Sequence, residues 1–330
     1  MLTGKNILVT GGAGFIGSNL VETLLNQGNT VTCLDNFSTG HRENIERFFS
    51  NPCFSLIEGD IRDLETCRNA VKGKNLVYHE AALGSVPRSI ADPVTSTHVN
   101  VLGFVNMLTA AKDEGITRFV YASSSSTYGD ADYSPKVEDK KGNLLSPYAI
   151  TKHSNDLFAK NFSALYGIET IGLCYFNVFG PYQDPNGAYA AVIPKFINIL
   201  MEHRQPTIYG DGKQSRDFTY VKNVVKANVL AGEAVLVNKH EHINVACNDS
   251  IDLTTLTQSI IDNLAQLDLE IGTIKPLYGD PRKGDIKNSL ASIEKARRIL
   301  HYEPEVFVKE GIALTTKWFF DRNKQRENKQ

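Results

Sequence analysis

The chain has 330 residues, of which 42% are hydrophobic and 22% charged, with 25 glycines and 12 prolines. These fractions exclude a collagen-like, coiled-coil or disordered chain, and the length suits one large α/β domain or two modest domains that share an interface. Thirty-five basic and 37 acidic side chains leave a net charge of −2, so the overall charge gives no reason to expect a nucleic-acid partner.

The cysteine content and the hydropathy pattern predict a cytoplasmic protein. Five cysteines occur without a CxxC pair, in a chain much larger than a disulfide-stapled domain, which favours a reducing compartment. No apolar run approaches the roughly 18 residues of a membrane span. The run Ile7–Thr10 is too short for a signal peptide, so we expect the folded protein to begin at Met1. The charged stretch 321–329 mixes both signs and predicts a solvated tail.

Strands and helices alternate through the first half of the chain. We predict strands at Ile7–Thr10, Thr30–Leu34, Phe54–Glu58, Asn75–Tyr78, Arg118–Ala122 and Ile168–Cys174, and helices at Phe15–Asn26, Glu43–Phe49, Leu64–Val71, Val94–Lys112 and Pro147–Tyr166. This rhythm is typical of βαβ units with right-handed crossovers. The fold class is therefore α/β, with a doubly wound parallel Rossmann sheet.

After about Asn177 the rhythm changes, and clusters of Gly, Pro, Asn and Asp break the chain into short segments. We predict helices near Val192–Glu202 and Asn223–Val235, a further sheet strand at His242–Ala246, and two helical stretches in the last block. This pattern predicts a dinucleotide-binding domain, 1–176 with 217–247. It also predicts a smaller, discontinuous α/β region, 177–216 with 248–330, over the carboxyl edge of the sheet.

The segment Thr10–Gly17 follows the first strand and opens the first helix. Gly11, Gly14 and Gly17 in this segment suit a tight turn, a close approach of the backbone to a pyrophosphate, and close helix–strand packing. The helix N-terminus, with Phe15 and Ile16, then presents free N–H groups to the phosphates.

The next two strands end in further candidate cofactor residues. Asp35 stands eighteen residues after Gly17, followed by Asn36. A carboxylate at this point accepts hydrogen bonds from a ribose diol and repels a 2′-phosphate, which favours NAD over NADP. Asp60 and Ile61 end the third strand, where an adenine would lie, although such a pair is a strand-end turn as often as a contact.

Tyr148 and Lys152 lie one helical turn apart at the start of a predicted helix. A tyrosine has a pKa of about 10, so a base that works near neutrality needs about 4 kcal/mol of stabilisation, and a neighbouring ammonium group and a positively charged nicotinamide both provide it. By itself this tyrosine could equally be a buried helix residue. However, the serine run Ser123–Ser126 directly follows a strand, at the edge where such sheets bind ligands, and a hydroxyl there can share a proton with Tyr148.

The local cluster His240-Glu241-His242 could suggest a metal site. Two histidines without an obvious third ligand favour a solvated turn, so we predict no metal.

With these motifs together, the chain resembles an extended short-chain dehydrogenase/reductase. More narrowly, it resembles the bacterial UDP-N-acetylglucosamine 4-epimerases that supply surface polysaccharides. The resemblance runs through nearly the whole chain, and its more specific parts are the segments Gly84–Ser89 and Gly187–Lys195. It implies that the first domain binds NAD and the second a UDP-sugar.

The resemblance also implies a mechanism. Tyr148 would take the O4 proton while the C4 hydride passes to NAD, the 4-keto sugar would turn over, and the hydride would return to the other face. Ser124 matches the catalytic serine of the family, with Ser125 and Ser126 as neighbours on the substrate side. Lys152 would hold the nicotinamide ribose and lower the pKa of Tyr148.

Two further groups of residues match substrate positions of the family. One would grip the UDP part, where a guanidinium fork suits a diphosphate; it comprises Asn177, Arg216, Arg282 and Asp285. Val192 and Tyr209 are further expected substrate-binding residues. The other consists of small residues that leave room for an N-acetyl group, namely Gly84, Ser85, Ala191 and Ser289. A bulky aromatic at position 289 would favour unacetylated sugars.

By the same resemblance, the helices at 94–112 and 147–166 would form a homodimer interface. The family usually carries an arginine where this chain has Cys174, which could affect stability. A 4,6-dehydratase is disfavoured because Ser125 and Ser126 replace its Asp-Glu pair. A UDP-glucuronate 4-epimerase or decarboxylase remains an alternative, as does a non-catalytic dinucleotide-binding protein.

Overall fold

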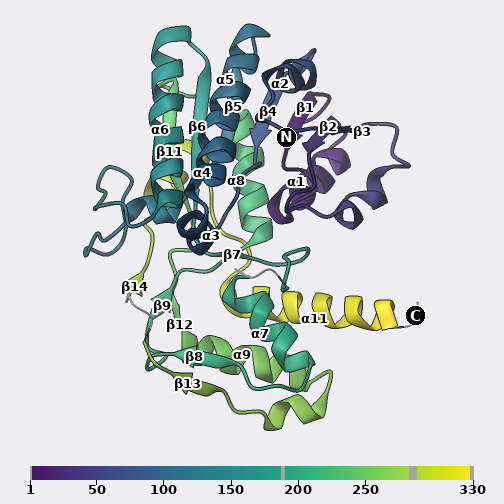
Figure 1. Ribbon diagram of the computed structural model, residues 1–330, viewed down its shortest axis with the longest axis vertical. Helices are drawn as coiled ribbons and strands as arrows, with labels where there is room; N and C mark the ends of the chain where they lie inside the picture. Colours follow the sequence, from purple (N-terminus) through teal and green to yellow (C-terminus); the bar gives the residue numbers. More distant parts are fainter. Residues whose placement is uncertain (1, 187–189, 282–287, 328–330) are drawn as a thin grey trace.

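The computed structural model describes residues 2–186, 190–281 and 288–327. Its centre is a sheet of seven parallel strands in the order β3-β2-β1-β4-β5-β6-β11 (Figure 1). The strands are β1 (Asn6–Thr10), β2 (Thr30–Asp35), β3 (Phe54–Glu58), β4 (Leu76–His79), β5 (Arg118–Ser124), β6 (Glu169–Tyr175) and β11 (His240–Val245). The predicted doubly wound Rossmann sheet is confirmed.

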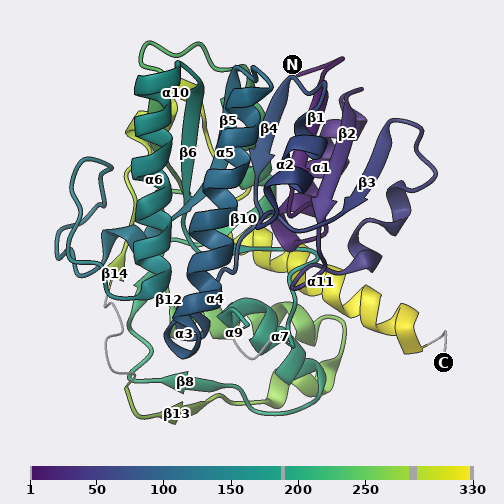
Figure 2. The ribbon, with the colours of Figure 1, turned by 45° about the horizontal axis from the view of Figure 1, so that its top comes forward.

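Helices cover both faces of this sheet. One face carries α1 (Phe15–Asn26) and α8 (Val221–Glu233), and the other carries α2 (Leu64–Val71), α5 (Gly103–Asp113) and α6 (Pro147–Tyr166) (Figure 2). Each face has its own hydrophobic cluster, with Leu20 and Val224 in the first and Phe104 and Ala159 in the second. The inner strands β1, β4, β5 and β6 are mostly buried on both faces, as in parallel sheets covered by helices, whereas the edge strand β3 is partly exposed.

Below the carboxyl edge of the sheet lies a smaller set of elements around a third cluster that includes Phe196 and Leu256. Its helices are α7 (Val192–Met201), α9 (Leu253–Ala265) and α11 (Val308–Glu327). Short strands form three small sheets in this part of the chain. Two sheets have two strands each: β7 (Val178–Phe179) pairs with β10 (Thr219–Tyr220), and β8 (Thr207–Tyr209) pairs with β13 (Leu277–Gly279). The third has the strand order β12 (Ile251–Asp252), β9 (Ser215–Arg216) and β14 (Asn288–Ser289).

Helix α10 (Glu294–Leu300) departs from this arrangement, because its buried Ala296 and Leu300 pack on the large sheet. Beyond β11 the described residues form three α-helices, α9, α10 and α11, where the sequence predicts two. The division into two domains stays a prediction.

Two predicted helices differ in detail. In place of one helix at Glu43–Phe49, the chain makes two 3₁₀ turns, Arg42–Asn44 and Glu46–Phe48, because the intervening Ile45 leaves helical geometry and is fully buried in the sheet cluster. The predicted helix Val94–Lys112 is α4 (Pro93–Thr97), a π turn (His98–Leu102) and α5. In the π turn the buried Asn100 side chain hydrogen-bonds both backbone groups of Leu83.

The predicted solvated tail is mostly exposed from Asp321 to Arg326, but as far as Glu327 it continues α11. Arg322 and Arg326 donate to Glu43 Oε1 over 2.5 and 2.9 Å, so the helix is tied to the segment after β2. Among the helices described, none is long and apolar enough to cross a membrane.

The predicted solvated turn at His240-Glu241-His242 is also wrong. These residues begin β11, which pairs with β6. His242 Nε2 lies 3.3 Å from Asp156 Oδ2 under α6, and Asp156 also accepts from Tyr121 and Lys141. Sheet pairing, which is non-local, decided the burial of this segment.

Candidate active site

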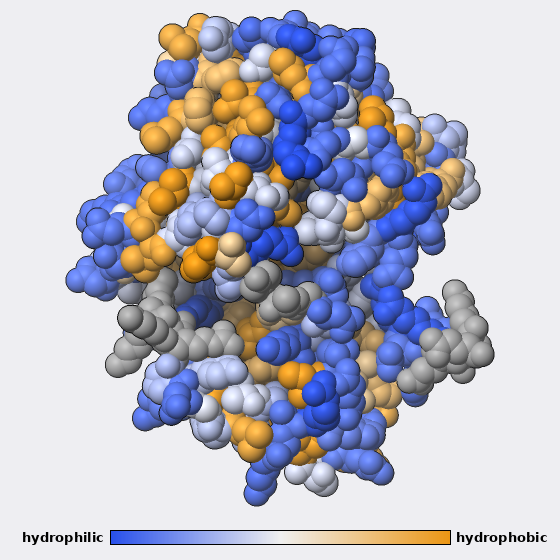
Figure 3. Space-filling model, viewed as in Figure 1, coloured by the Kyte–Doolittle hydropathy of each residue, from blue (hydrophilic) through white to orange (hydrophobic). Residues whose placement is uncertain are grey.

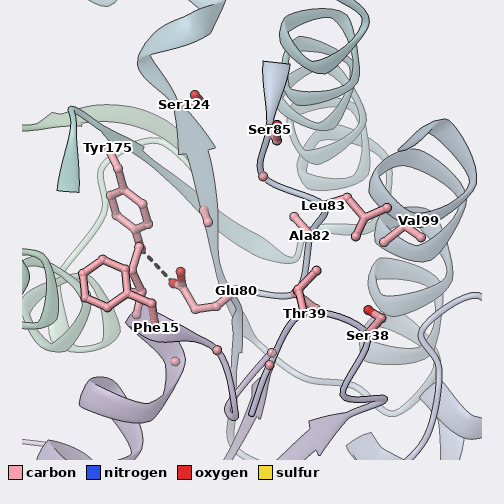
Figure 4. Close-up of a pocket in the computed structure, with 18 of the residues that line it drawn as sticks. Phe15, Ser38, Thr39, Glu80, Ala82, Leu83, Ser85, Val99, Ser124 and Tyr175 are labelled. Carbon is pink, nitrogen blue, oxygen red and sulfur yellow. Dashed lines mark hydrogen bonds between the residues drawn. The ribbon is translucent and has the colours of Figure 1, made fainter. Parts of the chain in front are cut away.

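A cavity of about 560 Å³ opens at the carboxyl ends of the strands. It is lined from the ends of β1, β2 and β3 on one side and from β4, β5 and β6 on the other. The strand order reverses between β1 and β4, which is where sheets of this kind bind ligands. Figure 3 shows the surface hollowed between the upper and lower layers, and Figure 4 shows side chains converging on the pocket from several strands.

The turn after β1 and the start of α1 leave no room for a side chain at Gly11 or Gly17. Gly11 has a φ of +69°, and a Cβ there would lie 2.7 Å from the Ala81 backbone nitrogen. A Cβ on Gly17 would lie 2.1 Å from Gly11 O. Gly14 caps α1, so the first N–H groups of the helix face the pocket. This cradle fits a dinucleotide pyrophosphate.

The carboxylates after β2 and β3 differ in charge environment. Asp35 accepts from the backbone of Ala13 at 2.9 Å and of Phe37 at 2.8 Å, and burial raises its pKa. Asp60 is bound by the Arg62 guanidinium, which lowers its pKa to about 2, and it accepts from Asn36 at 2.9 Å. Asp35, with no cationic side chain among its hydrogen-bond partners in the described residues, suits the uncharged ribose hydroxyls of NAD.

Tyr148 lies in the first turn of α6, where Ser146 and Pro147 fix its position. The Ser146 hydroxyl accepts from Ala149 N at 3.1 Å, and Tyr148 N donates to Ser89 Oγ at 2.9 Å. Burial raises the pKa of the Tyr148 phenol, and a hydrogen bond from Ser124 acts to lower it. Tyrosine and serine, 24 residues apart in sequence, are thus joined as a proton-sharing pair.

Lys152 follows one turn later on the same helix and is buried. Its Nζ donates to Ala122 O at 2.9 Å. Burial lowers its pKa to about 8, and the carboxyl groups of Glu80 and Asp156 act to raise it. The ammonium group is therefore mostly charged at neutral pH, as stabilisation of a phenolate requires.

Most of the predicted site residues line this one cavity: Gly11, Gly14, Phe15, Ile16, Gly17, Asp35, Asn36, Asp60, Ile61, Gly84, Ser85, Ser124, Ser125, Tyr148, Lys152, Asn177 and Ala191. Ser126 lies outside the lining and donates to Ser124 Oγ at 3.0 Å. Val192 begins α7 and packs on the lower cluster.

Three more predicted residues lie in the short strands of the lower layer, outside the cavity lining. Tyr209 ends β8, and Arg216 in β9 pairs in register with Ser289 in β14. Arg282 and Asp285 lie outside the described residues.

Several lining residues carried no predicted role, among them Glu80, Arg88, Tyr175 and Asp184. Glu80 is the first residue after β4, so its position at a strand end was the signal available. Cys174, where the family usually has an arginine, is fully buried in β6, and burial raises the pKa of its thiol.

Residues 7–246 match the family model described as the NAD dependent epimerase/dehydratase family. The chain belongs to this family. Like its relatives it has the extended short-chain dehydrogenase/reductase fold and uses NAD, which the glycine cradle and Asp35 accommodate.

Similar proteins cover almost the whole chain. A putative UDP-glucose 4-epimerase of Methanocaldococcus jannaschii is 37% identical over 96% of this chain and 99% of its own length. The structure of a UDP-N-acetylglucosamine 4-epimerase from Methanobrevibacter ruminantium M1, in complex with UDP-N-acetylmuramic acid, superposes with a TM-score of 0.91 at 39% identity, over 97% of this chain and 100% of that one. The UDP-glucose 4-epimerase of Thermus thermophilus in complex with NAD gives a TM-score of 0.83 at 32% identity, over 96% and 99%.

Proposed function

We propose that this protein is a UDP-sugar 4-epimerase that interconverts UDP-N-acetylglucosamine and UDP-N-acetylgalactosamine. The observation that carries the proposal is that the glycine cradle, the Tyr148–Ser124 pair, Lys152 and the small residues Gly84, Ser85 and Ala191 line one cavity. The cofactor and the reacting carbon of a sugar would therefore share one space.

In this proposal each catalytic residue has a separate task. Tyr148 takes the proton from O4 and later returns it, Ser124 hydrogen-bonds the phenol, and Lys152 supplies the positive charge that favours the phenolate. NAD, when bound, accepts the C4 hydride and gives it back. The turnover of the 4-keto sugar between the two transfers is what inverts C4.

The acetylated sugar is proposed from the room at the sugar end. A Cβ on Gly84 would meet nothing within 4 Å, so the wall is open at this point. The proposal keeps Asn177, Arg216, Arg282 and Asp285 for the UDP part, and Val192 and Tyr209 as further substrate-binding residues. Ser289 would favour acetylated over unacetylated sugars because its side chain is small. The product would feed surface polysaccharide synthesis.

The test is to incubate the purified protein with UDP-N-acetylglucosamine, UDP-glucose and UDP-glucuronate separately, and to resolve the products by NMR. We expect the acetylated sugar to be converted fastest. Ser289→Tyr should lower kcat/KM for UDP-N-acetylglucosamine by about tenfold or more and spare UDP-glucose, because the phenol ring would take the room of the N-acetyl group and a single methylene in a pocket is already worth about 1–3 kcal/mol. Preference for UDP-glucuronate would overturn the substrate, and no conversion of any sugar with added NAD would overturn the reaction.

We also propose a homodimer through α4, α5 and α6. Apolar side chains gather on this face of Figure 3, and on α6 they form one stripe that includes Ile150, Leu157 and Leu165, of which Leu157 is 56% and Leu165 64% exposed. Such a stripe is typical of an interface. Leu157→Asp should halve the mass in analytical ultracentrifugation. The control Val237→Asp, at an apolar loop residue elsewhere, should not.

The proposed compartment is the cytoplasm. All five cysteines are free thiols, as expected under reducing conditions.

A further inference from the structure

The segment 180–186, which follows β7, lines the cavity but has no task in the proposed mechanism. Its residues Gln183 and Asp184 belong to the cavity lining, whereas Tyr182 lies outside it. Residues 38–40, in the segment after β2, line the same cavity. These two segments are far apart in sequence, so the contacts between them decide how firmly they stay together at the cofactor end.

Two polar contacts join segment 180–186 to the cofactor layer. His41 Nε2 lies 3.4 Å from Asp184 Oδ2. Asn19 Nδ2, on α1, donates to Pro181 O over 3.1 Å. The segment is therefore tied both to the residues after β2 and to the helix that begins at the glycine cradle.

The Tyr182 ring makes the third connection. Arg47 Cζ lies 4.1 Å from its centroid and Arg322 Cζ lies 5.7 Å from it. The Trp318 ring packs edge to face against it, with a centroid distance of 4.9 Å. Both kinds of contact are attractive, because the face of an aromatic ring is negative and its edge positive. We call these four residues the Tyr182 stack.

The two arginines of the stack are themselves fixed. Arg47 Nη1 donates to Asn44 O at 2.6 Å, and Arg322 Nη2 donates to Glu43 Oε1 at 2.5 Å. Both acceptors belong to the segment after β2. In both ribbon views α11, which carries Arg322, lies below α1 and the β1–β3 side of the sheet (Figure 1, Figure 2). The stack thus joins α11, the segment after β2 and segment 180–186.

The backbone of Tyr182 shows that the grip on its ring has a consequence. Its φ is +70°, a left-handed conformation that is unfavourable for a residue with a large side chain. Such a conformation persists where the surrounding contacts hold it. The stack therefore keeps segment 180–186 in a shape that the segment alone would not prefer.

We propose that Tyr182 is a positioning residue for the cofactor: through its stack it holds segment 180–186 against the segment after β2 and so slows the release of NAD. The inference requires only that the protein binds NAD, and it is independent of the proposed sugar. It predicts that loss of the ring raises the dissociation rate of NAD.

The first test measures how fast NAD leaves the full-length protein. The protein is loaded with NAD, freed of excess, and mixed with a dehydrogenase and its substrate, which reduce each NAD that is released, so that NADH absorbance gives the rate. Tyr182→Asn suits a positive φ but removes the ring, and should raise the rate by about tenfold or more, because two cation–π contacts and one ring contact are lost. Tyr182→Phe keeps the ring and should stay within about twofold of the wild type.

Tyr133→Asn is the matched control. The Tyr133 ring also has two cations near it, Lys136 Nζ at 4.9 Å and Lys140 Nζ at 5.8 Å from its centroid, but Tyr133 lies outside the cavity lining. This variant should release NAD at the wild-type rate. Arg47→Met removes one cation of the stack without changing segment 180–186, and should raise the rate less than Tyr182→Asn.

The second test observes the stack in the cofactor-free protein. Trp318 is the single tryptophan of the chain, so its fluorescence reports on the stack alone. Acrylamide should quench Trp318 more strongly in Tyr182→Asn than in the wild type, because the Tyr182 ring covers part of the indole. Quenching in Tyr133→Asn should equal that of the wild type.

Faster NAD release in Tyr182→Asn, with the wild-type rate in Tyr133→Asn, supports the inference. A lower thermal unfolding temperature with an unchanged release rate means that the stack is structural only, and overturns it. Equal acceleration in both asparagine variants overturns it as well. If Tyr182→Asn does not fold, Arg47→Met decides in the same way. A protein that retains NAD through Tyr182 but converts no sugar leaves the inference standing and overturns the proposed function.

Discussion

The two ends of the pocket are built in different ways. The glycine cradle of the cofactor end comes from contiguous residues, since Thr10–Gly17 forms a strand end, a turn and a helix start in one stretch. The proposed sugar end combines α3 (Val86–Ala91) and its N-cap Ser85, the residue before α7, and the α6 start. Local geometry therefore decides the shape of the cradle, and long-range packing decides the proposed sugar end.

The largest expected effect lies where the two ends meet. Tyr148→Phe removes the proton acceptor and leaves the ring, so kcat should fall by about 10²–10⁴-fold while NAD still binds. Epimerisation assays and calorimetry with NAD measure the two quantities. Tyr278→Phe, at an exposed tyrosine outside the cavity lining, is the matched control and should retain kcat within a few fold. An equal loss in both variants would remove Tyr148 from the mechanism.

The comparison of the two ends can be tested with two alanines. Gly17→Ala places a Cβ 2.1 Å from the Gly11 carbonyl, where backbone must move, so we expect weaker NAD binding by tenfold or more and a loss of about 1–3 kcal/mol of stability. Gly84→Ala projects into open space and should change neither NAD affinity nor stability. Calorimetry and urea unfolding check both. If Gly17→Ala and Gly84→Ala changed NAD affinity and stability equally, the difference between the crowded cofactor end and the open end at Gly84 would be contradicted.

A third prediction concerns the buried cluster behind the catalytic helix. Burial lowers the pKa of His242 to about 4, so the folded protein binds fewer protons than the unfolded chain between about pH 6.5 and 4. Because of His242, the free energy of unfolding of the wild type should fall by about 2 kcal/mol between pH 7 and pH 5. In His242→Gln the fall should be smaller by this amount. Urea unfolding at both pH values measures the difference.

The control for this variant is His98→Gln, which replaces an exposed histidine. It should keep the pH dependence of the wild type. If His242→Gln keeps it too, the histidine is not neutral in the fold.

The smallest effect should come from the contact between α11 and the segment after β2. Burial acts to raise the pKa of Glu43, but the hydrogen bonds and charges of Arg326 and Arg322 outweigh it and lower the pKa. The contribution is present above the unfolded pKa and is lost as pH falls through the folded one. Glu43→Gln should cost less than about 1 kcal/mol at pH 7 and nothing near pH 3, by urea unfolding. If the stability lost in Glu43→Gln grew as the pH fell, the ion pairs of Glu43 with Arg322 and Arg326 would not be its cause.

By itself, the sequence determined the layer that holds the cofactor. The strands from Asn6–Thr10 to Glu169–Tyr175 fall within a few residues of their predictions, because buried parallel strands are continuous apolar runs and their helices are periodic. The positions of Gly11, Gly17 and Asp35 followed, since each sits at a strand or helix end that the pattern marks. Tyr148 and Lys152 share a face because helical spacing requires it.

Only the tertiary structure decided which distant segments meet. No local pattern pairs Glu80 with Tyr175, brings His242 under α6, or ties Arg322 to Glu43, because each contact depends on how whole elements pack. The same reason turned the predicted helix at Glu43–Phe49 into two 3₁₀ turns around the buried Ile45. Residue spacing along the chain fixes neighbours on one element, whereas burial and charge pairing between elements exist only once the sheet has formed.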